Sequence, residues 1–544
     1  MASVTFGLKE LKAKGLDERK ILEFMPKFGM EVESHGADEI TVDITPNRPD
    51  LLDSVGMARQ LRYFSGIAEP KEKGYKLSGS SGVRVEVGNG AASVRPFAAC
   101  IAVKNANLSG TRLKDLINFT EKLAVTYGRK RRKMAIGLHN LGAVKGGKLT
   151  YDASRSGEFV PLDGKRMMTF EQIIKEHEKG MEYSDTVKTK GGTLSAFLKD
   201  EEKILAMIPI INSEATRVTE STSELLVFVD GTSKKTVNDT MKILACSFID
   251  SGADVYSCAI KYKGLDETVP NLSAVEVRIR NSRIEKTIGA RIDPDQMVSL
   301  ANRMGYFGAK YGAYTLVYVP PYRADVLNEQ DVIEDIAMAY GYDRIKPAPI
   351  PSSQPGMPDR STERNHALYN MMVGLGFTEA MNMYLTNERT NFENMRRKYA
   401  KGEVMGLMNS KTESITMLRT SLLPCLLSDL RASTKERMPQ KMFELGKVFS
   451  MEEGRINEQD RMALVSEHSK ANFSEVRGVI GAIYDSTAAK YEVAEHSDPA
   501  FIEGRCAKVV VNGKDVAVFG EVHPAVLSNF KIEEPVVAAE LLIG

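Results

Sequence analysis

Four carboxylates stand close together in the sequence, around the start of one expected helix. Asp331, Glu334 and Asp335 are three and four positions apart, so a helix places them on one face. Asp325 precedes that helix and can fold back toward the same face. Clustered carboxylate oxygens suit a hard cation such as Mg²⁺, which uses one or two carboxylates and keeps several waters. The spacing therefore predicts a metal site.

The same acids have a second explanation. Acidic residues in the first turn of a helix are stabilised by its macrodipole, by about 0.3–1 kcal/mol each. Arg323 also lies close enough in the sequence to pair with them. From the residues alone, a metal site and a solvated, charge-paired helix start both stay open.

The helix that carries these acids has clear ends. Pro320 and Pro321 cannot continue a helix, Asn328 is a good N-cap, and Gly341 suits the position after the last turn. We therefore expect a helix over Glu329–Tyr340. Its buried stripe would consist of Val332, Ile333, Ile336 and Ala339.

Length and composition limit the possible classes of protein. A chain of 544 residues exceeds the size of one core, so three or four domains are expected. The formal net charge of +1 excludes a protein whose whole surface grips nucleic acid. The five cysteines and seven histidines form neither a Cys-x-x-Cys nor a His-Glu-x-x-His motif, so neither zinc nor disulfides are indicated. Without a signal peptide or an apolar run of about 20 residues, the expected compartment is the cytoplasm.

The first segment, 1–75, mixes helices with an alternating strand. We expect a helix around Leu16–Phe28 and a strand over Glu39–Thr45. After the strand, Pro46-Asn-Arg-Pro-Asp50 consists of turn-forming residues. This run predicts a structured corner in which Arg48 bonds a nearby acid.

Residues 71–90 are rich in Gly, Ser and Lys, a composition typical of a linker. From 90 to 264, short β runs alternate with helical segments, which predicts an α+β domain. Within it, the basic run Arg129-Lys-Arg-Arg-Lys133 has two explanations. It contacts phosphates through counterion release, or it is a solvated loop.

Polar residues also gather near the ends of two expected strands in this domain. Hydroxyls, an amide and a carboxylate stand beside Gly and Pro within Met207–Arg217 and Phe228–Thr232. Such groups can line a pocket that holds an amino-acid head group, although turn formation explains them as well. The candidate pocket residues are Ser213, Thr216, Asp230 and Thr232.

Three segments complete the chain. Residues 267–346 form a compact strand-helix-strand-helix unit that ends in the acidic helix. Residues 347–358 hold five prolines in twelve positions, which leaves little but extended chain. Within 361–544, strands are expected over Gly376–Leu385 and Gln440–Phe449.

Taken together, these motifs resemble the phenylalanyl-tRNA synthetase β subunit family, of the archaeal and eukaryotic type. The resemblance rests on Arg-x-Asp, Asp-x-x-Glu-Asp and Tyr-Gly-Tyr within 323–342, and on Asn-Arg-Pro-Asp-Leu-Leu at 47–52. Pro-Ile-Ile-Asn-Ser at 209–213 and Gly-Glu-Val-His-Pro at 520–524 add to it. The resemblance implies that the Mg²⁺ ligands are Asp325, Asp331, Glu334 and Asp335.

The resemblance also implies a multidomain α+β organisation. It comprises an N-terminal module (1–75), a tRNA-editing domain (90–264), a small DNA-binding-like, Mg²⁺-binding module (267–346), a linker (347–358) and an antiparallel class II synthetase-like domain (361–544). The editing domain would hydrolyse tyrosine wrongly attached to tRNA(Phe), in a pocket formed by Ser213, Thr216, Asp230 and Thr232. The chain departs from the family pattern at Ile208, where proline is usual, and at Asn140, where aspartate is usual. It also has Asp-Gly-Thr in place of Thr-Gly-Thr at 230–232.

The last domain has no Gly-x-Gly-x-x-x-Arg segment after Lys441. A reacting phosphate would then meet no positioned cation, so we expect this domain to be inert in adenylate formation. The resemblance implies that a separate α subunit, in an α₂β₂ heterotetramer, activates phenylalanine with ATP and Mg²⁺ and charges tRNA(Phe). Two alternatives stay open: a scaffold that binds tRNA without editing, and a free-standing metal-dependent hydrolase.

Overall fold

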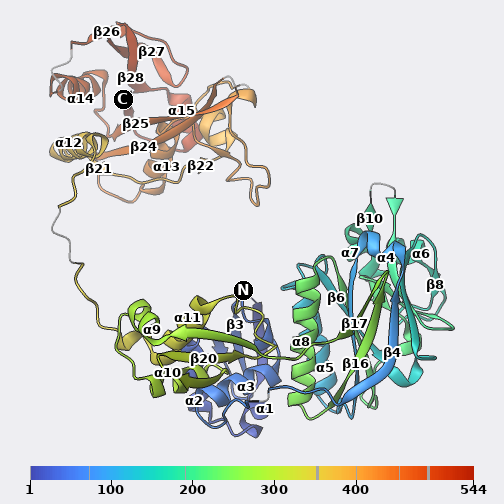
Figure 1. Ribbon diagram of the computed structural model, residues 1–544. Coiled ribbons are helices and arrows are strands. Elements are labelled where there is room, and N and C mark those ends of the chain that lie inside the picture. Colours follow the sequence, from blue (N-terminus) through green and yellow to red (C-terminus); the bar gives the residue numbers. More distant parts are fainter. Residues whose placement is uncertain are drawn as a thin grey trace. The chain divides into compact units, whose positions relative to one another are not determined.

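The chain folds into two compact units, Met1–Pro349 and Ile350–Gly544, in the computed structural model (Figure 1). The model describes residues 2–72, 74–189, 192–350, 355–399, 401–452, 454–486 and 490–543. The predicted linker 347–358 therefore lies partly outside the described residues. Each unit combines helices with its own sheets, which confirms a multidomain α+β protein. Among the helices described, none has the length and apolar character needed to cross a bilayer.

The first unit begins with a small three-stranded sheet in the order β1-β3-β2 (Ala2–Gly7, Glu39–Ile44 and Glu31–His35). Every second residue of β3 is buried, as the alternating sequence predicts. The predicted helix is confirmed as α2 (Glu18–Lys27), which Asp17 caps. A single 3₁₀ turn at the predicted corner leads into α3 (Ser54–Phe64).

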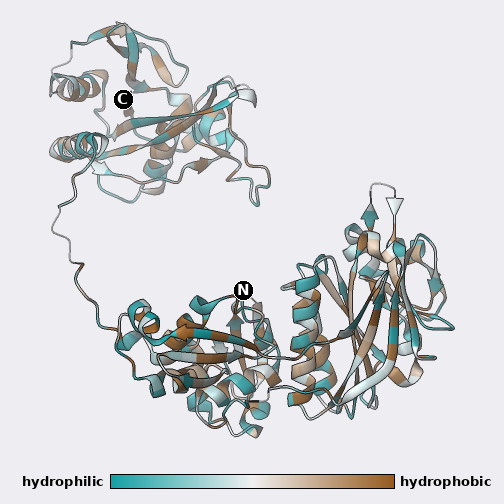
Figure 2. Cartoon of the chain, viewed as in Figure 1, coloured by the Kyte–Doolittle hydropathy of each residue, from teal (hydrophilic) through white to brown (hydrophobic). Residues whose placement is uncertain are grey.

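A ten-stranded sheet forms the middle of the first unit. Its order is β14-β13-β12-β7-β4-β16-β5-β15-β6, with β17 paired to β16. Apolar residues run along its central strands (Figure 2). Of the elements that matter below, the strands are β5 (Phe97–Lys104), β6 (Met134–Asn140), β13 (Ile204–Ile208), β14 (Ile211–Asn212) and β15 (Leu225–Gly231), and the helices are α5 (Arg112–Val125) and α8 (Lys234–Asp250).

One central strand lies where a linker was predicted. β4 (Gly79–Val87) pairs in parallel with both β16 (Asp254–Tyr262) and β7 (Lys148–Ser154). The linker prediction over 71–90 is therefore wrong for residues 79–87. The Gly and Ser content concealed a short alternating run in which Val85 is fully buried.

The acidic helix belongs to a three-stranded unit of order β18-β20-β19 (Val275–Arg280, Tyr314–Val319 and Phe307–Tyr311). α10 (Pro294–Arg303) and α11 (Glu329–Tyr340) pack against each other. The predicted bounds and N-cap of α11 are confirmed. Asn328 and Asp331 form a capping box at its start.

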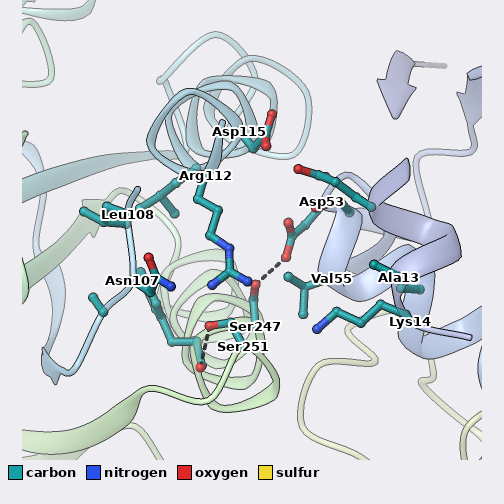
Figure 3. Close-up of a pocket in the computed structure, with 16 residues that line it drawn as sticks. Ala13, Lys14, Asp53, Val55, Asn107, Leu108, Arg112, Asp115, Ser247 and Ser251 are labelled. Carbon is teal, nitrogen blue, oxygen red and sulfur yellow. Dashed lines mark hydrogen bonds between the residues drawn. The ribbon is translucent and has the colours of Figure 1, made fainter. Parts of the chain in front are cut away.

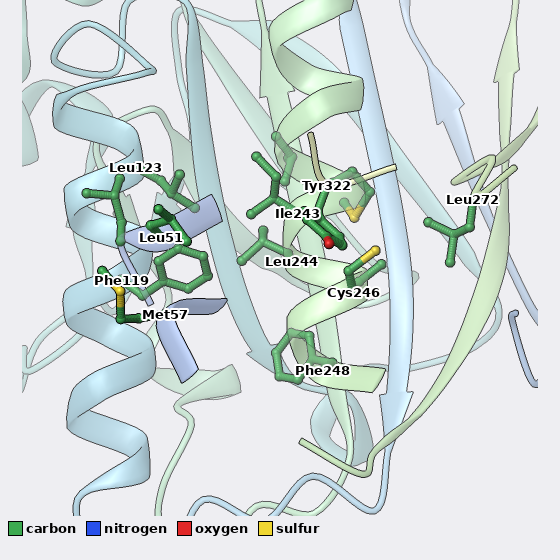
Figure 4. Packing of buried hydrophobic residues seen from close by; sticks show 14 of the residues in the cluster. Leu51, Met57, Phe119, Leu123, Ile243, Leu244, Cys246, Phe248, Leu272 and Tyr322 are labelled. Carbon is green, nitrogen blue, oxygen red and sulfur yellow. The ribbon is translucent and has the colours of Figure 1, made fainter. Parts of the chain in front are cut away.

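One hydrophobic core joins the three predicted N-terminal segments. Leu51 and Met57 from the first segment pack with Phe119 of α5 and with Leu244 of α8, and Tyr322 from the acidic segment reaches the same cluster (Figure 4). Residues that are distant in the sequence therefore depend on each other for burial. This shared core fixes the position of the sites described below.

The second unit contains a seven-stranded sheet of order β21-β24-β25-β29-β28-β27-β26, antiparallel except where β21 (Thr378–Glu379) pairs with β24 (Gln440–Glu452). β24 confirms the strand predicted over Gln440–Phe449. The strand predicted over Gly376–Leu385 is wrong: only β21 and the start of β22 (Leu385–Thr386) are extended pairs. The apolar side chains between them face solvent, with Met381 89% exposed.

The remaining strands of the second unit are β25 (Arg455–Glu467), β26 (Glu492–Glu495), β27 (Phe501–Val511), β28 (Lys514–Val522) and β29 (Val536–Leu542). Its helices are α12 (Arg360–Gly374), α13 (Leu423–Ala432), α14 (Phe473–Ser486) and α15 (Pro524–Phe530).

Candidate functional site

The four predicted metal ligands fall into three different environments. Asp335 is buried on α11, and Asp325 is nearly so in the preceding loop. Asp331 points back to the start of its own helix, where its carboxylate accepts from the backbone amides of Leu327 and Asn328, at 2.7 and 2.9 Å. Glu334 is exposed on the outer face of α11.

Arg323 binds the two buried carboxylates. Its Nε and Nη2 donate to both oxygens of Asp325, at 2.9 and 2.7 Å, and Nη2 also donates to Asp335 at 2.5 Å. Burial alone would raise the pKa of Asp325, but the charge and hydrogen bonds of Arg323 outweigh it and hold that pKa below its ordinary value. The alternative in which Arg323 pairs with these acids is thus confirmed for Asp325 and Asp335.

This arrangement does not fit a magnesium centre as it stands. The oxygens of Asp325 and Asp335 already have a guanidinium between them, and those of Asp331 bond backbone amides. Across the described ranges, no three His, Cys, Asp or Glu side chains converge as metal ligands do. The assignment of Asp325, Asp331, Glu334 and Asp335 as Mg²⁺ ligands stays a prediction, and no chemistry below depends on it.

The ion cluster continues into the N-terminal segment. Arg48 makes two 2.9 Å hydrogen bonds to Asp50, which confirms the predicted corner. Arg59 of α3 donates to Asp250 of α8 at 2.6 Å and stacks 3.6 Å above the Tyr322 ring. These buried charges join the first segment, the ten-stranded sheet and the acidic segment.

A cavity of about 470 Å³ opens in the ten-stranded sheet, between β6, β13, β14 and the end of β15. Pro209 and Ile210 form part of its apolar wall, and Asn212 faces it. Its polar lining includes His139, Arg131 and Asp230. A cavity of this size is large enough for an aromatic amino acid.

The four predicted pocket residues lie around this cavity, but only Asp230 lines it. Asp230 is buried and ion-paired with Arg95, and burial raises its pKa. Ser213 is buried behind the wall, where its hydroxyl donates to the Val160 carbonyl at 3.4 Å. Thr232 is exposed just past β15 and donates to the Arg132 carbonyl at 3.1 Å.

Thr216 acts on the cavity through His139, a residue that sequence reasoning missed. Thr216 Oγ1 and His139 Nδ1 share a 2.9 Å hydrogen bond, while His139 Nε2 has no partner among the residues described. His139 stands on the same face of β6 as Ala135 and Gly137, which also line the cavity. The signal in the sequence was the pair of small residues Ala135 and Gly137, which leave space on the face of the strand that His139 shares.

Burial lowers the pKa of His139 to about 4, below the ordinary value of about 6.5. The unfolded chain therefore takes up this proton first as the pH falls. We expect the contribution of the neutral, buried His139 to the free energy of unfolding to be complete above pH 6.5. It should fall by about 1.4 kcal/mol per pH unit between pH 6.5 and 4. Urea unfolding at pH 7, 6 and 5 should show a smaller loss of stability in His139→Asn. An equal loss in both proteins would contradict this assignment.

The basic run forms a strained turn beside the cavity. Arg129, Lys130 and Arg131 have φ values of 50°, 52° and 62°, a region that costs non-glycine residues about 1–2 kcal/mol each. The turn folds back on α5, because the three amides donate to the carbonyls of Thr126, Val125 and Ala124. Strain of this kind persists only where surrounding contacts fix it.

A smaller cavity, of about 200 Å³, lies where α3, α5 and α8 meet (Figure 3). Asp53 accepts a hydrogen bond from Ser247 there, and burial raises its pKa in spite of that bond. Arg112 is directed into the cavity toward Ser247. None of the predicted site residues lines this cavity.

In the second unit, the deepest charge is Arg419, which is fully buried. It donates to Glu444 at 2.6 Å and to the Lys447 carbonyl at 2.9 Å. Arg461 pairs with Glu540 at 3.2 Å. Arg419 and Arg461 are therefore each paired with a carboxylate.

Comparisons with known proteins cover nearly the whole chain. Residues 277–342 match the tRNA synthetase B5 domain, and residues 347–543 match the phenylalanyl tRNA synthetase beta chain CLM domain. The phenylalanine–tRNA ligase beta subunit of Archaeoglobus fulgidus is 37% identical, over 99% of this chain and 98% of that protein. That of Methanocella arvoryzae is 33% identical over the full length of both.

A solved structure supports the same relationship. An N-terminal fragment of the phenylalanyl-tRNA synthetase beta subunit from Pyrococcus horikoshii superposes with a TM-score of 0.59 and 28% identity. The match covers 63% of this chain and all of the fragment. The sequence motifs, the shared fold and the full-length similarity lead to one conclusion: the chain belongs to the family of phenylalanine–tRNA ligase beta subunits, the aminoacyl-tRNA ligases specific for phenylalanine.

Proposed function

We propose that this chain supports ATP-dependent charging of tRNA(Phe) by a separate α subunit, in an α₂β₂ assembly, and itself hydrolyses tyrosyl-tRNA(Phe). The cavity beside Asp230 carries the second part of the proposal. Its volume, about 470 Å³, accommodates a tyrosyl group, and its lining combines apolar and polar residues. Of the predicted residues, Asp230 lines the cavity, Thr216 bonds the lining residue His139, Ser213 follows the lining residue Asn212, and Thr232 lies two residues beyond Asp230.

Hydrolysis at this cavity is an attack by water. The water oxygen bonds to the ester carbonyl carbon, the bond from that carbon to the ribose oxygen breaks, and the proton passes to the ribose oxygen. His139 is neutral at pH 7, because its pKa is about 4, and its free Nε2 can hold either the water or the substrate. Thr216 fixes the ring through Nδ1.

The second unit is proposed to be a class II synthetase-like domain that packs on the α subunit without activating phenylalanine. Its largely antiparallel sheet suits that fold. The buried Arg419 is already paired with Glu444, and the partly exposed Arg461 with Glu540. The test is phenylalanine-dependent ATP–pyrophosphate exchange, measured for this chain alone and after addition of the α subunit. Exchange should require both chains, and exchange by the chain alone would overturn this division of roles.

Ser213→Ala and Thr232→Ala are each expected to slow tyrosine release about 5–10-fold. Thr232→Ala removes the hydrogen bond to the Arg132 carbonyl, and Ser213→Ala removes the two long bonds to the Val160 carbonyl and from the Ala215 amide, a loss of about 1–1.5 kcal/mol in each case. The measurement is release of tyrosine from tyrosyl-tRNA(Phe) by the assembled complex, with phenylalanylation measured alongside.

Ser221→Ala is the matched control, because Ser221 is exposed and bonds only the Thr219 side chain in the described structure. Phenylalanylation should persist in all three variants. Full-rate tyrosine release in both test variants would show that these two positions do not serve the pocket. A wild-type complex that releases no tyrosine would instead favour the scaffold without editing.

A further inference from the structure

The strained turn at 129–133 is held rigidly from both sides. Its amides bond the last carbonyls of α5. Its own carbonyls are bonded too: Arg95 donates to the Arg131 oxygen at 3.0 Å, and Thr232 donates to the oxygens of Arg132 and Lys133. A Cβ on Gly231 would stand only 2.1 Å from the Lys133 oxygen, so the turn and the end of β15 are in direct backbone contact.

This geometry separates the basic side chains into two groups. Arg131 turns inward, donates to the carbonyls of Pro209 and Ile210 at 3.0 and 2.9 Å, and stacks 4.2 Å from the Tyr183 ring. Arg129, Lys130 and Arg132 remain exposed. Within the described ranges, these three side chains form no hydrogen bond or ion pair. Arg132 acts only through its charge on Asp185, whose carboxylate already pairs with Lys188 at 2.7 Å.

The turn also lies between two cavities. Arg131 lines the cavity beside Asp230. Arg129 and Lys133 line a second cavity, of about 550 Å³, together with Tyr127 and Lys235. The three unpaired cations Arg129, Lys130 and Arg132 thus stand on the same rigid turn as Arg131, which lines the proposed hydrolytic pocket.

We propose that Arg129, Lys130 and Arg132 bind the sugar–phosphate backbone near the 3′ end of the tRNA and direct that end into the cavity beside Asp230. Phosphate is the chemistry that fits, because the cations are exposed, adjacent and without partners, while the chain as a whole has a net charge of only +1. Localised cations of this kind add affinity without reading sequence. The inference rests on the proposed hydrolysis of tyrosyl-tRNA(Phe) at that cavity.

The test is the triple variant Arg129→Ala, Lys130→Ala, Arg132→Ala in the assembled complex, with tyrosyl-tRNA(Phe) as substrate. KM for tyrosine release should rise at least tenfold, while kcat at saturating tRNA changes less than twofold. The dependence of log KM on log salt should become shallower by about 2, since each lost phosphate contact removes roughly 0.7–0.9 from the slope. An unchanged KM and salt slope would overturn the proposal.

Two further variants separate charge from folding. Lys114→Ala, Lys263→Ala, Lys286→Ala removes three other exposed cations of the same unit and should leave KM within twofold of wild type. Arg129→Lys, Lys130→Arg, Arg132→Lys keeps the charge and should keep the KM. A tenfold rise in KM in either variant would contradict a specific phosphate contact by the turn.

If the wild-type complex releases no tyrosine, the proposed hydrolysis fails but the turn can still be tested. Chemical footprinting of uncharged tRNA(Phe) on the complex then reports the contact directly. The contact is supported if protection near the 3′ end is lost in the variant with alanine at 129, 130 and 132, and kept in the control with alanine at 114, 263 and 286. Equal protection in both variants overturns it.

Discussion

Replacing Arg323 by methionine is expected to destabilise the first unit by about 3–5 kcal/mol. The change removes the cation that pairs with the buried carboxylates of both Asp325 and Asp335, and the Tyr306 hydroxyl, which also donates to Asp335, carries no compensating charge. Methionine keeps much of the side-chain volume, so the loss is mainly electrostatic. Urea unfolding followed by far-UV circular dichroism measures the change, since the chain contains no tryptophan.

Arg283→Met provides a control in the same unit. Arg283 forms an ion pair with Glu329 at 2.5 Å, but its side chain is 53% exposed. An exposed pair contributes about 0–1 kcal/mol, so this variant should unfold close to wild type. Equal losses in the two variants would show that the Arg323 cluster is not a buried structural pair.

Arg419→Met is expected to cost the second unit a similar amount, about 3–5 kcal/mol, because it leaves the buried Glu444 carboxylate without its counter-ion, with Asn382 as a neutral donor. The double variant Arg419→Met, Glu444→Leu should recover most of this loss, since an apolar pair can replace a buried ion pair with little cost. Lys447→Met, which removes an exposed cation near Glu458 and Asp460, should cost less than about 1 kcal/mol.

Thermal and urea unfolding of the wild type, Arg419→Met, Glu444→Leu and the double variant form a double-mutant cycle for Arg419 and Glu444. A double variant as unstable as Arg419→Met alone would mean that the arginine contributes through packing, for example with the Tyr384 ring 5.0 Å away, and not through the carboxylate.

Local sequence signals predicted single elements well. Asn328 and Gly341 fixed the bounds of α11 because capping acts within a few residues. The alternation in 39–45 predicted β3 because successive side chains of a strand point to opposite faces. These features depend on neighbours in the chain and are therefore visible without a structure.

Contacts between distant segments were not predictable in the same way. The sequence left pairing with Arg323 as one of two explanations of the acids, and only the fold shows that its guanidinium binds Asp325 and Asp335 together. His139 was missed as a cavity residue because Thr216, 77 positions later, defines its role. The Gly376–Leu385 run was read as a strand, yet no neighbouring strand covers Met381.

The link between Arg59, Asp250 and Tyr322 has a consequence for synthesis of the protein. At 5–20 residues per second, a ribosome needs on the order of 10–50 s to extend the nascent chain from residue 59 to residue 322. During that interval Arg59 of α3 has Asp50 as a partner, but the Tyr322 ring on which its guanidinium stacks is still missing. The amino-terminal segment can therefore complete this buried contact only after residue 322 has left the exit tunnel.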